Sequence, residues 1–346
     1  MRPPTLKKPP MITETLMTWQ TMSTDWQREL RQAIYDTRHL LELLELSHDE
    51  LAPALSTKQH FGLRVPRGYV AKMRKGDPQD PLLRQVLPLA KETEQLPHFN
   101  TDPTGDIAAE QVPGLLQKYQ GRVLLITTGA CAIHCRYCFR QYYAYNASKP
   151  ILNQTVFDAI QADASITEVI LSGGDPLSRL DSKLADLAQR LANIPHVQRL
   201  RLHTRLPIVL PERVNDELLA WLTGTRLQPV VVVHANHANE IDTHVNQALQ
   251  KLVAAGITVL NQSVLLRGVN DNVAALIALS EALFSNRVLP YYLHLLDRVQ
   301  GAAHFEVAEE TALELLKSMR EALPGYLVPK LVREVAGMPY KQPLSN

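Results

Sequence analysis

Short apolar runs rich in β-branched residues recur along the chain from Arg122 onward. They cover 122–129, 168–174, 198–204, 229–236, 257–266 and 289–296. From the second run on, their starts lie roughly 30 residues apart, which is the length of one unit of a strand and a helix. Continuous apolar strands of this kind are typical of a parallel sheet that helices cover.

Helical patterns fill the intervals between these runs, most clearly at 182–194 and 272–285. The alternation predicts an α/β fold, either an open doubly wound sheet or a partial barrel of six strand and helix units. In both architectures ligands bind at the carboxyl ends of the strands.

The first 115 residues lack this alternation. Apolar residues near helical spacing from Thr24 to Leu44 favour one amphipathic helix. Pro, Gly and Asp then break the chain into short helical pieces. We therefore expect a mostly helical appendage over 1–115, a barrel over 116–300 and a C-terminal extension over 301–346.

Polar residues follow each of the six predicted strands. The cysteine cluster at 131–138 follows the first strand. The next five strands are followed by Gly173, Gly174 and Asp175; His203, Thr204 and Arg205; His234, Asn236, His237 and Asn239; Asn270 and Asp271; and Asp297. Taken singly, each is more typical of a loop or of a scaffold group with its hydrogen bonds satisfied. Together they predict one polar mouth at the carboxyl ends of the strands.

Composition excludes several classes of protein. An apolar share of 45% and a charged share of 21% are ordinary for a globular protein, and a formal net charge of +1 indicates no nucleic-acid partner. The sequence has no run of about 18 apolar residues that would predict a membrane span, and it shows no signal peptide. We expect a cytoplasmic protein.

All three cysteines of the chain, Cys131, Cys135 and Cys138, fall within eight positions directly after the first predicted strand. In a reducing compartment such a cluster indicates ligands or catalysts rather than disulfides. A structural zinc ion needs four ligands, and His134, inside the loop, is awkwardly placed to be the fourth. A cubane iron–sulfur cluster on three cysteines leaves one iron open to a ligand.

The spacing C-x₃-C-x₂-C, with the aromatic Tyr137 before the last cysteine, resembles the signature of the radical S-adenosylmethionine enzymes. The resemblance implies a partial (β/α)₆ barrel and a 4Fe–4S cluster on the three cysteines. It also implies that the open iron chelates S-adenosylmethionine, which is cleaved to a 5'-deoxyadenosyl radical. The SGGDP segment, with Gly173, Gly174 and Asp175, resembles the glycine-rich element that accepts the amino group of that cofactor.

Longer segments are similar to the lysine 2,3-aminomutase branch of these enzymes, and most of all to its shorter members, which make (R)-β-lysine for elongation factor P. The similarity covers about residues 63–343 and includes KYQGRVLLITTGACAIHCRYCFRQ, NQSVLLRGVND, PYYLHLLDRVQGAAHF and GYLVPKLVREVAGMPYKQP. It implies conversion of (S)-α-lysine into (R)-β-lysine with pyridoxal phosphate as radical carrier. An external electron donor, elongation factor P and its β-lysine ligase are the implied partners.

The resemblance also assigns residues. Lys341 would hold pyridoxal phosphate as a Schiff base, and the phosphate would be held by Lys118, Tyr119, Arg122 and Gln262. Arg140 would pair with the substrate α-carboxylate, and Asp297 and Glu334 with its ε-ammonium. Glu334 departs from the aspartate of the aminomutases by one methylene, which changes the depth of the pocket. Without the resemblance, Lys341 is typical of a solvated tail, and Asp297 and Glu334 of surface salt bridges.

Other functions remain consistent with the sequence. Within the same chemistry the alternative is a stand-alone metabolic aminomutase of lysine or arginine. Outside it, the alternatives are a non-enzymatic iron–sulfur sensor or electron carrier, and a structural zinc module. The longer aminomutases bind zinc between subunits through further cysteines that this chain lacks, so any homo-oligomer must be held in another way.

Overall fold

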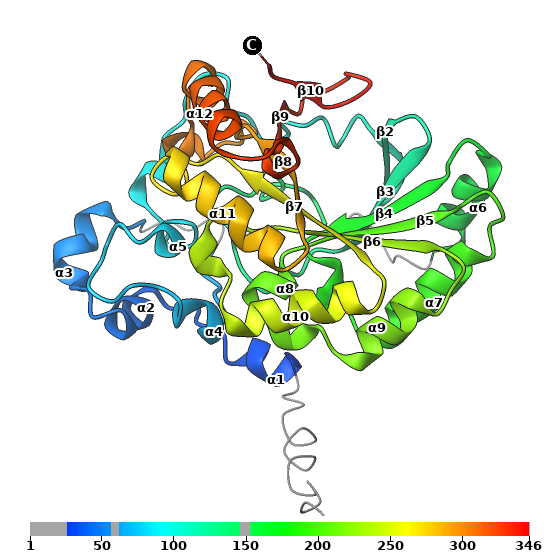
Figure 1. Cartoon of the computed structure of the whole chain (residues 1–346), viewed down its shortest axis with the longest axis horizontal. Coiled ribbons are helices and arrows are strands. Elements are labelled where there is room, and N and C mark those ends of the chain that lie inside the picture. The colour runs from blue at the N-terminus through cyan, green and yellow to red at the C-terminus, as the bar shows by residue number, and fades with distance from the viewer. Residues whose placement is uncertain (1–25, 57–61, 146–152, 346) are drawn as a thin grey trace, which may run out of the picture.

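The computed structural model describes residues 26–56, 62–145 and 153–345. A single curved sheet of ten strands, in the order β1 to β10, dominates the molecule (Figure 1). The strands are β1 (Glu110–Val112), β2 (Leu115–Tyr119), β3 (Arg122–Thr128), β4 (Glu168–Gly173), β5 (Arg199–Thr204), β6 (Gln228–Val233), β7 (Thr258–Val264), β8 (Leu289–His294), β9 (Lys330–Arg333) and β10 (Gln342–Pro343).

Strands β3 to β9 are parallel, and each pairs with the next along the chain. Strands β1 and β2 extend one end antiparallel, and β10 folds back antiparallel on β9 at the other. The order ends at β1 and β10, so the sheet is an open partial barrel and the expected fold class is confirmed. Strands β3 to β8 are the six strands that the apolar runs predict. Strand β9 is a seventh parallel strand, which the apolar runs do not predict.

Helices run along the outer side of the sheet (Figure 1). Those between the strands are α6 (Gln154–Ala162), α7 (Asp181–Ala192), α8 (Leu206–Val209), α9 (Asp216–Thr223), α10 (Thr243–Ala254), α11 (Val273–Ser285) and α12 (Glu309–Ala322). The patterns at 182–194 and 272–285 correspond to α7 and α11. No helix within the described ranges is long and apolar enough to cross a membrane.

The N-terminal segment contains the short helices α1 (Trp26–Arg31), α2 (Thr37–Leu43), α3 (His48–Leu51), α4 (Arg67–Val70) and α5 (Pro81–Arg84). The prediction of one helix from Thr24 to Leu44 is wrong within the described residues, and Thr24 lies outside them. The chain leaves α1 so that Ile34 can form a bridge with Val65, with N···O distances of 2.8 and 3.0 Å. Asp36 then starts α2 by accepting a hydrogen bond from His39 N at 2.8 Å, because a short carboxylate satisfies a free helical N–H.

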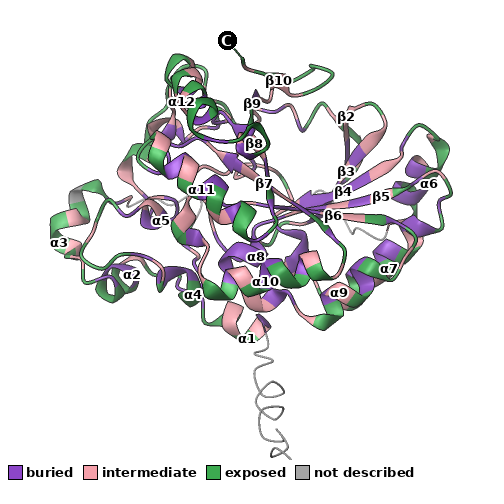
Figure 2. Ribbon diagram, in the orientation of Figure 1, coloured by how far each residue is buried: buried purple, intermediate pink, exposed green. Residues whose placement is uncertain are grey.

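Both flanking segments pack on the barrel. Tyr69 and Leu82 belong to the same buried apolar cluster as Val169 and Leu202 of the sheet. A second cluster joins Leu316 of α12 and Leu331 of β9 to Leu293 of β8. Figure 2 shows this burial along the strands and on the helix faces turned toward them.

A buried arginine ties the N-terminal segment to the loop after β4. The Arg213 side chain is fully buried, and its Nε donates to the carbonyl oxygen of Leu177 at 2.7 Å. Its Nη2 donates to Asp181 Oδ1 at 2.7 Å, and the guanidinium carbon lies 4.8 Å from the centroid of the Trp26 ring. Because Leu177 directly follows the SGGDP segment, Arg213 fixes the position of that loop.

We expect Arg213→Met to lower the free energy of unfolding by about 3 to 5 kcal/mol, because the Asp181 carboxylate loses its buried cation. Chemical denaturation of the full chain measures this. The matched control Arg74→Met removes an exposed arginine and should change the value by less than about 0.5 kcal/mol. Equal effects of the two substitutions would contradict the role given to Arg213.

Candidate active site

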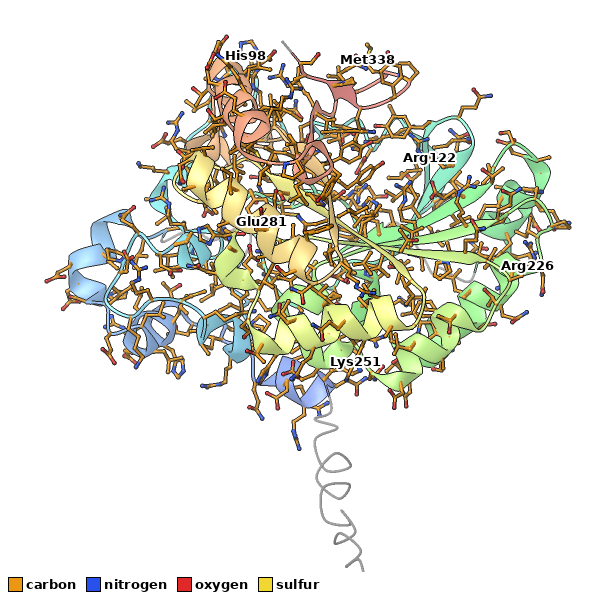
Figure 3. The ribbon with its side chains drawn as sticks, viewed as in Figure 1. His98, Arg122, Arg226, Lys251, Glu281 and Met338 are labelled. Carbon is orange, nitrogen blue, oxygen red and sulfur yellow. The ribbon has the colours of Figure 1, made fainter. Side chains whose placement is uncertain are left out.

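A cavity of about 740 Å³ is lined by residues of β2 to β5 and β7 to β10, and by residues of the loops after β3 to β6, after β8 and after β9. Its volume lies in the usual range of small-molecule sites. It brings together all fourteen residues that the sequence nominates: Cys131, Cys135, Cys138, Gly173, Gly174, Asp175, Lys118, Tyr119, Arg122, Gln262, Arg140, Asp297, Glu334 and Lys341. Figure 3 labels Arg122, the first residue of β3, and Met338, in the loop between β9 and β10, both in the upper part of the view.

The polar mouth is smaller than the sequence predicts. His203, Thr204, Arg205, His234 and Asn236 line the cavity, but the remaining four polar residues after strands do not: His237, Asn239, Asn270 and Asp271. The side chains of His237, Asn270 and Asp271 accept hydrogen bonds from the backbone, whereas Asn239 is exposed. The Asn270 carboxamide, for example, accepts from Leu266 N and donates to the Asn236 carbonyl.

The cavity also extends beyond the carboxyl ends of the strands. Arg122 and Glu168 line it from the first positions of β3 and β4. The site therefore occupies the inside of the partial barrel, from one end of the strands to the other.

The three cysteines stand in the tight turns after β3, partly exposed. Burial raises the pKa of the Cys131 thiol well above its ordinary value. Burial, with the neighbouring Cys135 adding to it, raises the pKa of Cys138 to about 12. Cys131 and Cys138 are therefore neutral thiols near pH 7 unless a metal centre supplies the charge that turns them into thiolates.

The three thiols fit an iron–sulfur cluster by their number and chemistry. In a cubane each thiolate binds a different iron at a different corner. Three soft sulfur donors around one cavity are the ligand set that an iron–sulfur centre takes.

The loop after β4 packs directly against the cysteine loop. Gly174 N donates to Thr128 O at 2.6 Å, and Asp175 N donates to Ala130 O at 2.8 Å. A Cβ on Gly174 would lie 2.3 Å from Ala130 O, and Gly173 has a φ of +122°, so neither position accepts a side chain. This contact is a packing reason for both glycines. The contact of this loop with S-adenosylmethionine stays a prediction.

A cationic region lies where β2 meets β3. The Arg122 guanidinium carbon is 4.5 Å from the centroid of the Tyr119 ring, and Lys118 lies one residue before that tyrosine. On β7, Gln262 Nε2 lies 2.9 Å from His234 Nε2. Lys118 and Arg122 are cationic groups of the kind that binds a phosphate.

Asp106, which the sequence did not indicate, does not line the cavity but pairs with two residues that do. Its carboxylate, 2% exposed, lies between Lys118 Nζ at 2.6 Å and Arg140 Nε at 2.5 Å. Burial opposes ionisation, but Arg140 and then Lys118 outweigh it and hold the pKa of Asp106 well below its usual range. Arg140 also donates from Nη1 to Ser172 Oγ at 3.0 Å, so its guanidinium is fixed in orientation.

The hairpin of β9 and β10 carries two further site residues at its loop end. Gln342 pairs with Arg333, which places Glu334 and Lys341 opposite each other. Lys341 Nζ donates to the Glu334 carboxylate, and Tyr119 OH donates to the same group at 2.6 Å. Burial would raise the pKa of Glu334, but Lys341 and these hydrogen bonds lower it, so this group is a carboxylate.

Comparison with known proteins decides the family. Residues 120–199 match the model of a 4Fe–4S single cluster domain. The chain is 48% identical over 319 residues to an L-lysine 2,3-aminomutase of Haemophilus influenzae, covering 92% of this chain and 94% of that protein. An L-lysine 2,3-aminomutase of Escherichia coli is 47% identical, covering 92% of this chain and 94% of that protein. One of Clostridium subterminale is 33% identical, covering 92% of this chain and 77% of that protein.

The chain belongs to the L-lysine 2,3-aminomutase family. Membership confirms the resemblance and the expected class of enzyme, an isomerase. It also confirms the expected cofactors of the family, a 4Fe–4S cluster, S-adenosylmethionine and pyridoxal phosphate. The individual site residues stay predictions.

We expect Asp106→Asn to lower the free energy of unfolding by about 3 kcal/mol, because Lys118 and Arg140 lose their shared counter-charge inside the protein. Urea denaturation measures this. Glu45→Gln, which removes an exposed carboxylate paired with Lys75, is the control and should stay within about 0.5 kcal/mol of the parent. If the Asp106 variant were as stable as that control, its carboxylate would not be the group that holds the two cations in place.

Proposed function

We propose that this aminomutase converts (S)-α-lysine into (R)-β-lysine, with pyridoxal phosphate attached at Lys341. The observation that carries the proposal is the placement of Lys341 and Glu334 at one end of a hairpin, in the same cavity as Arg140 and Asp297. Relatives named L-lysine 2,3-aminomutase at 47 to 48% identity support it.

The charges of the cavity match a lysine molecule. Its α-carboxylate suits the oriented guanidinium of Arg140, which can bind both carboxylate oxygens. Its ε-ammonium suits Asp297 and Glu334. A substrate with an acidic distal group, such as glutamate, would place like charges together, so the site disfavours it.

The residues present fit the three cofactors. Cys131, Cys135 and Cys138 would hold the cluster, and Gly173, Gly174 and Asp175 line the cavity beside them. Lys118, Tyr119, Arg122 and Gln262 would hold the phosphate of pyridoxal phosphate. When bound, the cluster with S-adenosylmethionine supplies a carbon radical, and pyridoxal phosphate carries the migrating nitrogen.

In the protein without bound ligands, Glu334 holds the Lys341 side chain in place. Its contact with Lys341 Nζ keeps that amine inside the cavity, although the lysine lies near the end of the chain. Attachment of pyridoxal phosphate at Lys341 would take that amine away from Glu334. The Glu334 carboxylate would then be available to the ε-ammonium of the substrate.

Lys341→Ala is expected to abolish formation of β-lysine, because no other amine would fix pyridoxal phosphate in the same position. The full chain is reconstituted anaerobically with iron, sulfide and pyridoxal phosphate and incubated with (S)-lysine, S-adenosylmethionine and dithionite. The amino acid products are then separated. Lys317→Ala, on the exposed side of α12, should retain activity. Isomerisation of lysine by the Lys341 variant at the parent rate would overturn the placement of the cofactor.

Asp297 predicts a pH dependence. Burial raises its pKa to about 7, against the opposing effect of Lys341 and with Glu334 adding to the rise. Below that pH the carboxyl is neutral and cannot pair with the substrate ammonium, which keeps its proton to about pH 10. We expect the KM for lysine to fall as the pH rises from about 6 to about 8.

Asp297→Asn should raise the KM and remove this dependence, whereas Asp271→Asn, outside the cavity, should keep it. Steady-state kinetics of both variants across this range measure the effect. An unchanged pH profile in Asp297→Asn would show that another group titrates.

The proposed physiological role is supply of (R)-β-lysine to the ligase that attaches it to elongation factor P, in the cytoplasm and with electrons from an external donor. A stand-alone metabolic enzyme is distinguished by rapid turnover of free lysine. A sensor or electron carrier is distinguished by the absence of S-adenosylmethionine cleavage. Measurement of 5'-deoxyadenosine beside β-lysine separates the three.

A further inference from the structure

A buried polar network lies behind the cysteine loop, with Arg205 at its centre. Arg205 directly follows β5 and is 5% exposed. Its Nη1 donates a hydrogen bond to the Sγ atom of Cys135 at 2.7 Å. A cationic donor therefore lies directly against one of the three thiol sulfurs.

The guanidinium is held from several parts of the chain. Nη2 donates to Glu240 Oε2 at 2.8 Å, to Gln85 Oε1 at 2.7 Å and to Tyr69 OH at 3.2 Å. The backbone N of Arg205 donates to Asp175 Oδ2 at 2.6 Å. The N-terminal segment and the loops after β4 and β6 all contribute, so the position of this charge relative to Cys135 is fixed.

Glu240 completes an oriented ion pair. Its carboxylate is fully buried, and Oε1 accepts from the backbone N of Asn236 at 2.8 Å and of His237 at 3.1 Å. The pair of Arg205 and Glu240 is neutral as a whole. Its positive end contacts the sulfur, and its negative end contacts the loop after β6.

We propose that Arg205 sets the reduction potential of the cluster by placing a fixed positive charge and an N–H donor on the sulfur of Cys135. The proposal rests on Cys135 being a cluster ligand. Reduction adds one electron from the donor to the cluster, with no bond made or broken, so the reduced cluster carries one more negative charge. Nearby charge and hydrogen bonds to the sulfurs tune such potentials. Here the N–H donor, and the positive end of the pair that lies nearest the sulfur, favour the reduced form. Arg205 acts through Cys135 and is a positioning residue.

The test is a redox titration of the reconstituted full-length protein with dithionite, followed by the electron paramagnetic resonance signal of the reduced cluster. Arg205→Gln should lower the equilibrium constant for reduction about tenfold, which is a shift of about 59 mV to a more negative potential for a one-electron couple. Glu240→Gln should shift the potential in the opposite direction, because it removes the negative end and leaves Arg205 in place.

A double variant separates the effect of the lost charge from the effect of misfolding. Arg205→Gln alone leaves the Glu240 carboxylate buried without a cation, whereas Arg205→Gln combined with Glu240→Gln leaves no unpaired charge. The double variant should lie between the parent and Arg205→Gln. Lys75→Gln, which removes an exposed charge, should keep the parent potential.

Equal potentials in the parent, the double variant and Glu240→Gln would overturn the role of Arg205, as would a shift of Arg205→Gln toward positive values. Iron and sulfide content separates this result from a failure of the proposed function. A parent protein that binds no cluster would refute the cysteine assignment first and this proposal with it. Clusters with unchanged potentials would refute only the role of Arg205.

Discussion

The close approach of two backbones at the ends of β3 and β4 is the constraint on which the rest of the site depends. Gly174 N lies 2.6 Å from Thr128 O, and no Cβ fits beside Ala130. The cysteine loop is thus braced by the neighbouring loop through main-chain hydrogen bonds. Because backbone contacts hold this loop in place, three cysteines suffice to position a metal centre on it. A cubane held by three cysteines keeps one iron free of protein ligands.

Buried carboxylates organise the charges around this loop. Asp106 joins Lys118 to Arg140, Glu334 joins Lys341 to Tyr119, and Glu240 holds Arg205; these contacts are all inside the protein. A buried charge is costly unless it is paired, so each carboxylate also fixes the position of its cation. Charged ligands that enter the cavity therefore exchange one partner for another, at positions that the ion pairs have already set.

The parts of the fold that depend on local pattern were predictable from the sequence. Strands β3 to β8 have apolar runs long enough to recognise, and the spacing of the cysteines limits the chemistry of their loop. Strand β9 has only four residues and β10 only two, which is too short for a periodic signal. The break at Ile34 depends on pairing with Val65, a long-range contact that helical spacing does not encode.

The site residues divide in the same way. The sequence indicates Arg140 and Lys341 because the long segments around them resemble a family. Asp106 and Glu240 matter through ion pairs with arginines far away in the sequence. Asp106 lies in a turn-rich segment, where an acidic residue is ordinary. Asn270 and His237 show the converse, since polar residues directly after strands became scaffold groups. Position after a strand places a residue near the mouth, but only three-dimensional packing decides whether it faces the cavity.

The C-terminal hairpin shows how little main-chain structure holds a central residue of the site. Strand β10 pairs with β9 over two positions, one of them Pro343, which has no N–H to donate. Leu344 N adds one hydrogen bond to Leu331 O at 2.9 Å. The ion pair of Lys341 with Glu334 is therefore a large part of what closes the hairpin over the cavity. Any ligand that competes for Glu334 must also loosen this closure, so occupancy of the ammonium site and the position of Lys341 are physically coupled.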